Sequence, residues 1–134
     1  MNKAAEIVSK SIINEEHVNI VVQGKIYCVK PLTIKKICKV LFHFSHITID
    51  QNYTKISILS EIPNNKKAII SGLAVSITDN IFKRIMLKRR LYNSTNKEID
   101  DIWNEIIPMF GGDDFFGYAL SMRSATEMIA KPKL

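Results

Sequence analysis

The sequence contains few cysteines and few glycines, and each shortage argues against a class of protein. Two cysteines, Cys28 and Cys38, are too few for a disulfide scaffold, so we expect both to be reduced. None of the five glycines belongs to a glycine-rich phosphate-binding or dinucleotide-binding motif. The sequence also lacks a serine-hydrolase elbow and a metalloprotease motif. We therefore expect no enzyme and no cofactor.

Long apolar segments are absent from the sequence as well. The longest stretch without charge, residues 68–78, is far shorter than the ~20 residues that a membrane-spanning helix requires. The first sixteen residues carry five charged side chains and no apolar core, so we expect no signal peptide. These features predict a cytoplasmic protein without membrane contact.

The composition itself is that of a packed globule, with 46% hydrophobic and 24% charged residues. A chain of 134 residues suits one domain, so residues 1–134 are expected to form a single domain. Within it we expect a mobile arm at 1–16, a hairpin at 17–32 and a helical region at 33–130. The predicted fold class is mostly α (α+β), with an N-terminal β-hairpin followed by a compact bundle of about five helices.

Two β-rich runs, Val18–Val22 and Lys25–Val29, are separated only by Gln23-Gly24. This spacing predicts a β-hairpin in which Gly24 adopts a positive φ. Thr33 is a good N-cap for the helix that follows. The apolar spacing in that helix predicts a buried stripe made of Ile34, Ile37, Cys38, Leu41 and Phe42.

Three more helical segments are expected from apolar periodicity. Ala4–Asn14 is expected as a short helix ahead of the hairpin. A short helix is expected from Tyr53 to Ile62, although Ile56 and Ile58 would also suit a strand, and it ends at a break formed by Pro63-Asn64-Asn65. Lys66–Ile77 is apolar on all sides, which is typical of a central helix, and Gly72 in its middle indicates a close helix crossing.

Two helices with one inward face each are expected next, followed by a terminal helix. Asp79 or Asn80 caps the first, which ends near Tyr92 and turns Ile81, Phe82, Ile85 and Met86 inward. Thr95 and Glu98 form the capping pair of the second, whose inward residues are Ile99, Ile102, Trp103, Ile106 and Ile107. It stops at Pro108, and Asp113 or Asp114 caps the last helix, from Phe115 to about Ala130.

Two groups of side chains resemble metal or catalytic sites. One is a possible four-ligand zinc set, made of Cys28, Cys38, His43 and His46. It lacks the closely spaced cysteine pair of structural zinc sites, so we favour two buried, inert thiols and no metal. The other is acidic, and its members Glu98, Asp100, Asp101 and Glu105 fall mainly opposite an apolar stripe. That position predicts a solvated helix face.

The net charge of +6 is unevenly distributed. Residues 31–92 hold eleven Lys or Arg and three acids, whereas residues 93–134 hold four Lys or Arg and seven acids. The densest basic surface consists of Lys83, Arg84, Lys88, Arg89 and Arg90. These cations suit a small DNA-binding or DNA-packaging accessory protein, but they spread around the helix and no aromatic interleaves them. We favour a basic surface that meets protein or solvent, and the charge asymmetry also suits a homo-oligomer.

Aromatic residues gather around glycines near the C-terminal end, a pattern typical of an adaptable protein-binding surface. The candidate partner-binding residues are Phe110, Phe115, Phe116, Tyr118 and Met122. The alternative is that these side chains close the core.

The run Gly24–Thr33, followed at once by an amphipathic helix, resembles the opening of the tail assembly chaperones of tailed bacteriophages. Those proteins often begin with a strand pair that ends in Tyr-x-Val-x-Pro-Leu-Thr. The matching residues are Tyr27, Val29, Pro31, Leu32 and Thr33. The resemblance implies a non-enzymatic virion assembly factor of a phage or prophage, acting in the cytoplasm of the bacterial host cell. Such a factor covers apolar helices of a tape-measure protein and recruits tail subunits, which is helix-in-groove recognition.

Overall fold

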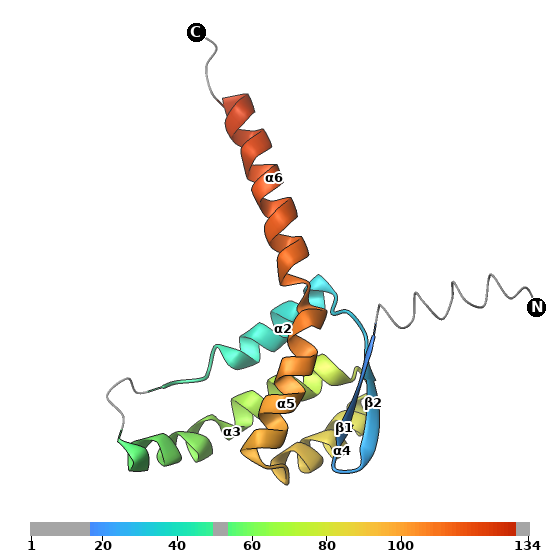
Figure 1. Ribbon diagram of the computed structural model, residues 1–134, viewed down its shortest axis with the longest axis vertical. Helices are drawn as coiled ribbons and strands as arrows, with labels where there is room; N and C mark the ends of the chain where they lie inside the picture. The colour runs from blue at the N-terminus through green and yellow to red at the C-terminus, as the bar shows by residue number, and fades with distance from the viewer. Residues whose placement is uncertain (1–16, 50–53, 131–134) are drawn as a thin grey trace, which may run out of the picture.

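The computed structural model describes residues 17–49 and 54–130 (Figure 1). The hairpin strands are β1 (Val18–Val22) and β2 (Lys25–Val29), and the helices are α2 (Ile34–Phe44), α3 (Lys55–Ile77), α4 (Ile81–Tyr92), α5 (Asn96–Ile106), the 3₁₀ turn η1 (Ile107–Phe110) and α6 (Gly112–Ala130). The expected fold class, a hairpin followed by a mostly helical region, is confirmed. The helix expected at Ala4–Asn14 lies outside the described residues. Among the helices described, none is long and apolar enough to cross a membrane.

The expected hairpin is confirmed, and its register places Val18 opposite Val29 and Val22 opposite Lys25. Gln23 and Gly24 both have positive φ, at 49° and 80°, which is the pattern of a type I′ turn. Glutamine is less common than asparagine or aspartate at the first position of such a turn. The side-chain amide of Gln23 explains its presence here, because its Nε2 donates to Glu98 Oε2 at 3.1 Å. Arg90 Nη1 in turn donates to the Gln23 carbonyl at 3.2 Å. These bonds tie the turn to the junction between α4 and α5.

The inward face of the hairpin and one face of each helix from α2 to α5 share a single core. Strand alternation places Ile20, Val22, Tyr27 and Val29 on the inward face. β1 lies beside α5 and β2 beside α3 (Figure 1). The buried helical residues include Val40, Leu73, Leu87, Leu91, Ile102 and Ile106.

The break expected at Pro63 is wrong, because α3 runs without interruption from Lys55 to Ile77. Proline removes only one backbone donor, and packing around the rest of the helix outweighs that local cost of ~3 kcal/mol. Asn65 is buried and joins the helix to the preceding connection. Its Nδ2 donates to the carbonyls of Thr48 and Glu61, and its Oδ1 accepts from the Thr48 N–H at 2.8 Å. The central helix expected at 66–77 is confirmed in its last two turns, where residues 71–77 are all buried, whereas Lys66 and Lys67 are exposed.

The buried stripe expected on α2 is also wrong, except at Ile37. The inward residues are Val40 with the partly buried Ile37 and Phe44, whereas Ile34, Leu41 and Phe42 are exposed. The helix offers two overlapping apolar stripes. The face that turns inward is the one that carries Phe44, whose ring occupies the space left by Gly72 of α3. The close helix crossing expected at Gly72 is therefore confirmed.

In α4, as in α2, the buried face differs from the one that the sequence predicts. Leu87 and Leu91 are buried, and the residues expected inward are all exposed: Ile81, Phe82, Ile85 and Met86. Apolar residues lie all around this helix, so their spacing alone does not select a face. The cap at Asn80 is confirmed, since its Oδ1 accepts from the Phe82 and Lys83 N–H groups.

The helix α5 follows the sequence more closely. Thr95 caps it by accepting from the Glu98 N–H at 3.2 Å. Ile102 and Ile106 are buried and Ile99 and Trp103 half-buried, whereas Ile107 has left the helix and is exposed. The chain then tightens into η1, which is fixed to the body because the Leu32 N–H donates to the Met109 carbonyl at 2.9 Å.

Candidate protein-binding helix and groove

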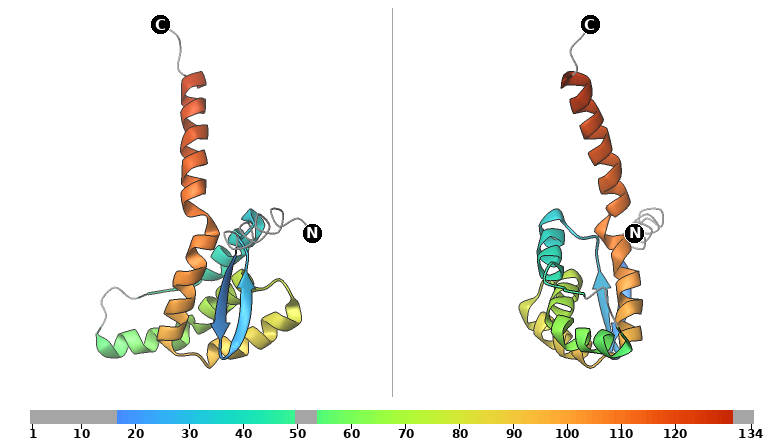
Figure 2. Two further views of the ribbon diagram at one scale, coloured as in Figure 1. Left: turned by 45° about the vertical axis from the view of Figure 1, so that its right-hand side comes forward. Right: turned by 90° about the vertical axis from the view of Figure 1, so that its left-hand side faces the viewer.

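The last helix, α6, leaves the body of the protein and points away from it in every view (Figures 1 and 2). Gly111 provides the corner, with a φ of 64° that glycine adopts without strain. The Phe115 N–H donates to the Gly111 carbonyl at 3.0 Å, so helical bonding starts directly after the corner. The expected cap at Asp113 or Asp114 is therefore wrong, because both residues already lie in the first helical turn.

Four of the five candidate partner-binding residues are on α6 and are exposed. The exposed fractions are 58% for Phe115, 65% for Phe116, 43% for Tyr118 and 64% for Met122. Every side chain from Gly112 to Ile129 is exposed except that of Ala119, which is half-buried. The alternative that these residues close the core does not hold for α6.

Phe110 is separated from the other four candidates. It lies in η1, where the turn folds its ring back onto the body. The ring meets Trp103 edge-to-face with 5.6 Å between centroids, and Phe110 is half-buried against the core. We therefore assign Phe110 to packing.

The exposed apolar residues of α6 fall on more than one face. Phe115, Tyr118, Met122 and Ile129 recur at spacings of three, four and seven and share one face, called here the aromatic face. Phe115 and Tyr118 already contact edge-to-face at 5.3 Å. Phe116 and Leu120 lie about a quarter-turn or more away from this face. Two surfaces of α6 are thus available for contacts.

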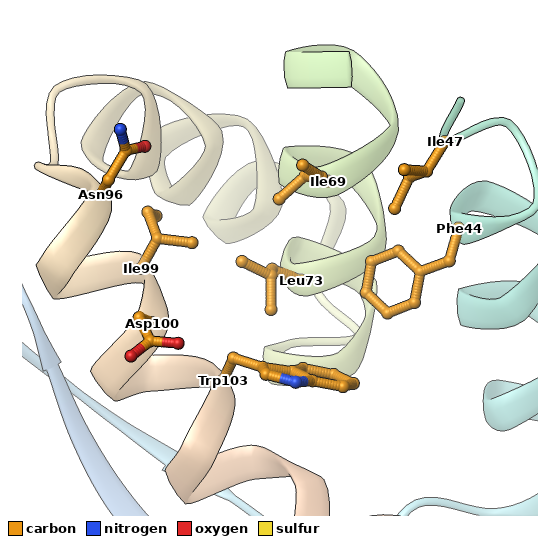
Figure 3. A pocket seen from close by; sticks show the side chains of 8 residues that line it. All are labelled: Phe44, Ile47, Ile69, Leu73, Asn96, Ile99, Asp100 and Trp103. Carbon is orange, nitrogen blue, oxygen red and sulfur yellow. The ribbon is translucent and has the colours of Figure 1, made fainter. Parts of the chain in front are cut away.

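A groove runs between α3 and α5 on the body of the protein (Figure 3). One half is a cavity of about 460 Å³. It is lined by Phe44, Ile47, Ile69, Leu73, Ile99 and Trp103, with Asn96 and Asp100 at its α5 edge (Figure 3). The Trp103 indole and the Phe44 ring close one end of this cavity, where they meet edge-to-face with 5.5 Å between ring centroids.

The second half of this groove, about 450 Å³, lies toward the start of α3. The two halves share Ile69, Asn96 and Ile99, so they are continuous. Lys66 and Tyr92 belong both to this half and to a neighbouring depression whose basic residues are Lys66, Lys67, Lys88 and Arg89. The α3/α5 groove therefore has an apolar floor and a basic end. The sequence indicated the apolar residues of its walls but not the groove that they form.

The basic residues expected to act as one surface have different roles in the structure. Arg84 Nη2 donates to the Thr78 carbonyl at 3.2 Å, and Arg90 is bonded to the hairpin turn. Lys88 and Arg89 border the groove, and Lys83 is exposed on α4.

A second basic cluster was not identified from sequence. Lys30, Lys35, Lys36, Lys39 and Arg84 line a depression of about 340 Å³ between α2 and the start of α4. Asp79 lies in it and pairs with Lys36 at 3.2 Å. The excess of positive charge in residues 31–92 was the only signal of this cluster.

The proposed buried thiols are wrong, since Cys28 and Cys38 are both exposed. Cys28 lies on the outward side of β2, between the inward Tyr27 and Val29, and Cys38 lies on the outer side of α2. Within the described ranges, no group of three or more His, Cys, Asp and Glu side chains is placed to hold a metal ion.

His43 on α2 is half-buried. Burial lowers the pKa of its imidazole below the ordinary value, and the positive charges of Lys88, His46 and Arg84 lower it further. The acidic residues of α5 are exposed as expected: Glu98, Asp100, Asp101 and Glu105. These groups do not converge with His43 on a catalytic geometry.

The fold and its surfaces define a small helical protein with an exposed apolar helix and an apolar groove. In comparisons with known proteins, no protein-family model, no curated protein and no solved structure matches the chain. The likeness to tail assembly chaperones thus rests on five residues at the end of the hairpin. Tyr27, Val29 and Leu32 are buried there, and Thr33 caps α2 through the Lys36 N–H.

Proposed function

We propose that this protein is a non-enzymatic assembly factor that binds apolar helices of other proteins. The observation that supports the proposal is α6, which holds large apolar side chains in solvent while the rest of the chain has a packed core. Monomeric soluble proteins rarely expose such contiguous apolar surface unless a partner covers it. Copies of the chain also associate with one another, as the uneven charge of the sequence favours.

The partner class that the N-terminal resemblance favours is the tape-measure protein of a phage or prophage tail, together with tail subunits. A tape-measure protein is a long, apolar helical chain, which is the kind of ligand that a helix-and-groove surface recognises. The partner-binding residues in this proposal are Phe115, Phe116, Tyr118 and Met122. A tape-measure gene in the same gene cluster is expected.

The test is capture of a tape-measure fragment by the purified chain, measured by calorimetric titration. Phe116→Ala should weaken capture by ~1–3 kcal/mol, because it removes an exposed aromatic anchor from α6. Phe82→Ala is the matched control, since Phe82 is 81% exposed on α4 and lies outside the proposed surface. Circular dichroism should show both variants folded. Equal binding by wild type and Phe116→Ala, or equal losses in both variants, would contradict the proposal.

A further inference from the structure

We infer that the α3/α5 groove of one copy binds helix α6 of a second copy. This inference rests on the self-association proposed above and names the two surfaces that carry it. Each copy contains both an apolar helix that stands off the body and an apolar groove of helical length. In an assembly of identical chains, the helix of one copy and the groove of another are present at equal concentration.

The dimensions of the two surfaces agree. The stretch of α3 that lines the groove, from Ile62 to Leu73, is roughly 16 Å long at 1.5 Å per residue. The aromatic face of α6 extends roughly 10 Å from Phe115 to Met122 and reaches Ile129 after roughly 21 Å. The two halves of the groove, about 460 and 450 Å³, provide room for aromatic and methionine side chains.

The charges of the two surfaces are complementary as well. One end of the groove is bordered by Lys66, Lys67, Lys88 and Arg89. The first turn of α6 carries Asp114, which is exposed and borders the aromatic face beside Phe115, whereas Asp113 lies on the opposite side of the helix with Leu120. Opposite charges that meet at one end set the direction in which the helix lies. The start of α6 thus faces the basic end, and its methionine-bearing half faces Trp103 and Phe44.

Helix α6 does not occupy the groove of its own copy, because contacts on both sides of the joint at Gly111 fix the direction in which α6 leaves the body. Before the joint, Phe110 packs on Trp103 and the Met109 carbonyl accepts from the Leu32 N–H. After the joint, the Gly111 carbonyl accepts from the Phe115 N–H. With these contacts in place α6 points away from its own body (Figure 2). Two copies that exchange α6 form a closed dimer, and successive docking forms longer chains.

The first experiment reverses the charges. Light scattering of the full chain should show self-association, and Asp114→Lys should weaken it at least tenfold. Lys66→Glu/Arg89→Glu should weaken it as much. An equimolar mixture of these two variants should associate again. The reversed helix of one variant then meets the reversed groove of the other, and the two unchanged surfaces also meet with opposite charges. The control is Lys35→Glu/Lys39→Glu on α2. It changes the net charge by the same amount as Lys66→Glu/Arg89→Glu and should leave association unchanged.

The apolar contact is tested separately on α6. Met122→Lys places a charge on the aromatic face and should abolish association, whereas Leu120→Lys places the same charge about half a turn away and should not. Circular dichroism controls for the fold of each variant.

A crosslink shows which copy contributes the helix. In a chain with Cys28→Ser and Cys38→Ser, one preparation carries Ala119→Cys and another carries Asn96→Cys. The mixture should form a disulfide-linked heterodimer under mild oxidation, and neither preparation alone should do so to the same extent.

The outcomes separate this inference from the proposed function. A strict monomer at all concentrations would overturn both the self-association and the docking site. An oligomer whose association neither charge reversal weakens would support self-association but overturn the groove as its site. A monomer in which one chain carrying both cysteines crosslinks internally would overturn docking between copies. Capture of a tape-measure fragment is a separate readout.

Discussion

Gly72 of α3 lies directly against the ring of Phe44 from α2. A Cβ atom at position 72 would overlap that ring, with its Cδ1 and Cζ atoms only 2.7 and 2.9 Å away. Trp103 contacts the ring edge-to-face on the side of the groove, so a ring that withdraws from position 72 disturbs that contact. This contact fixes the crossing of the two helices and with it one wall of the α3/α5 groove.

Gly72→Ala should therefore destabilise the protein by a net of up to ~2 kcal/mol. Alanine gains ~1 kcal/mol of helix propensity over glycine, but overpacking a filled core costs ~1–3 kcal/mol and sometimes more. Gly112→Ala is the matched control, because a Cβ there meets open space. Urea denaturation of both variants measures the difference. A stabilised Gly72→Ala protein would show that the ring moves aside freely.

Asn65→Ala should loosen the connection between α2 and α3. The Asn65 side chain bonds both backbone groups of Thr48, and its loss leaves these groups without that partner. The expected cost is about 1–3 kcal/mol. Asn64→Ala, at an exposed neighbouring position, should cost much less. Hydrogen exchange at the Thr48 amide reports the effect directly, and unchanged protection in Asn65→Ala would contradict it.

His43 should titrate below its ordinary pKa of about 6.5. Since folding lowers this pKa, the unfolded chain binds the proton more tightly than the folded chain does. The contribution of His43 to stability is thus fully present above pH ~6.5 and is lost as the pH falls through the lowered pKa. Proton NMR of the imidazole measures the pKa. Lys88→Gln should raise the pKa by removing a nearby positive charge, and an unchanged pKa would exclude Lys88 as a cause.

DNA binding should be absent or non-specific. Two of the five expected cations, Arg84 and Arg90, donate to backbone carbonyls of the protein. The lysines around α2 and α4 can still attract phosphates, but such contacts weaken steeply as salt rises. A fluorescence titration should find no sub-micromolar binding near ~150 mM salt. Tight, sequence-dependent binding under that condition would favour the DNA-binding alternative.

The sequence by itself determined much of the local structure. The two strands, the Gln23-Gly24 turn and the caps at Thr33 and Thr95 depend on residues close together in the chain. These features were therefore predicted with the correct positions. Gly72 also indicated a helix crossing, because a glycine within a helix calls for a compensating contact.

The tertiary structure decided which helix faces turn inward. Both α2 and α4 carry apolar residues on more than one side, so periodicity left two choices for each. The Phe44–Gly72 contact selected one face of α2, and packing of Leu87 and Leu91 selected one face of α4. Residues assigned to the core from sequence, such as Leu41 and Phe82, are exposed as a result.

The sequence placed the exposed aromatics near the C-terminal end, but it left open whether they close the core. The corner at Gly111 decides this question, because it separates Phe110 in the core from Phe115 and the later residues in solvent. The α3/α5 groove was not predictable from sequence, since its walls come from α2, α3 and α5, and only their packing brings Phe44, Ile69 and Trp103 together. Local chemistry fixed the hairpin and the starts of α2 and α5, whereas long-range packing carried α3 through Pro63 and created the surfaces on which the proposed function depends.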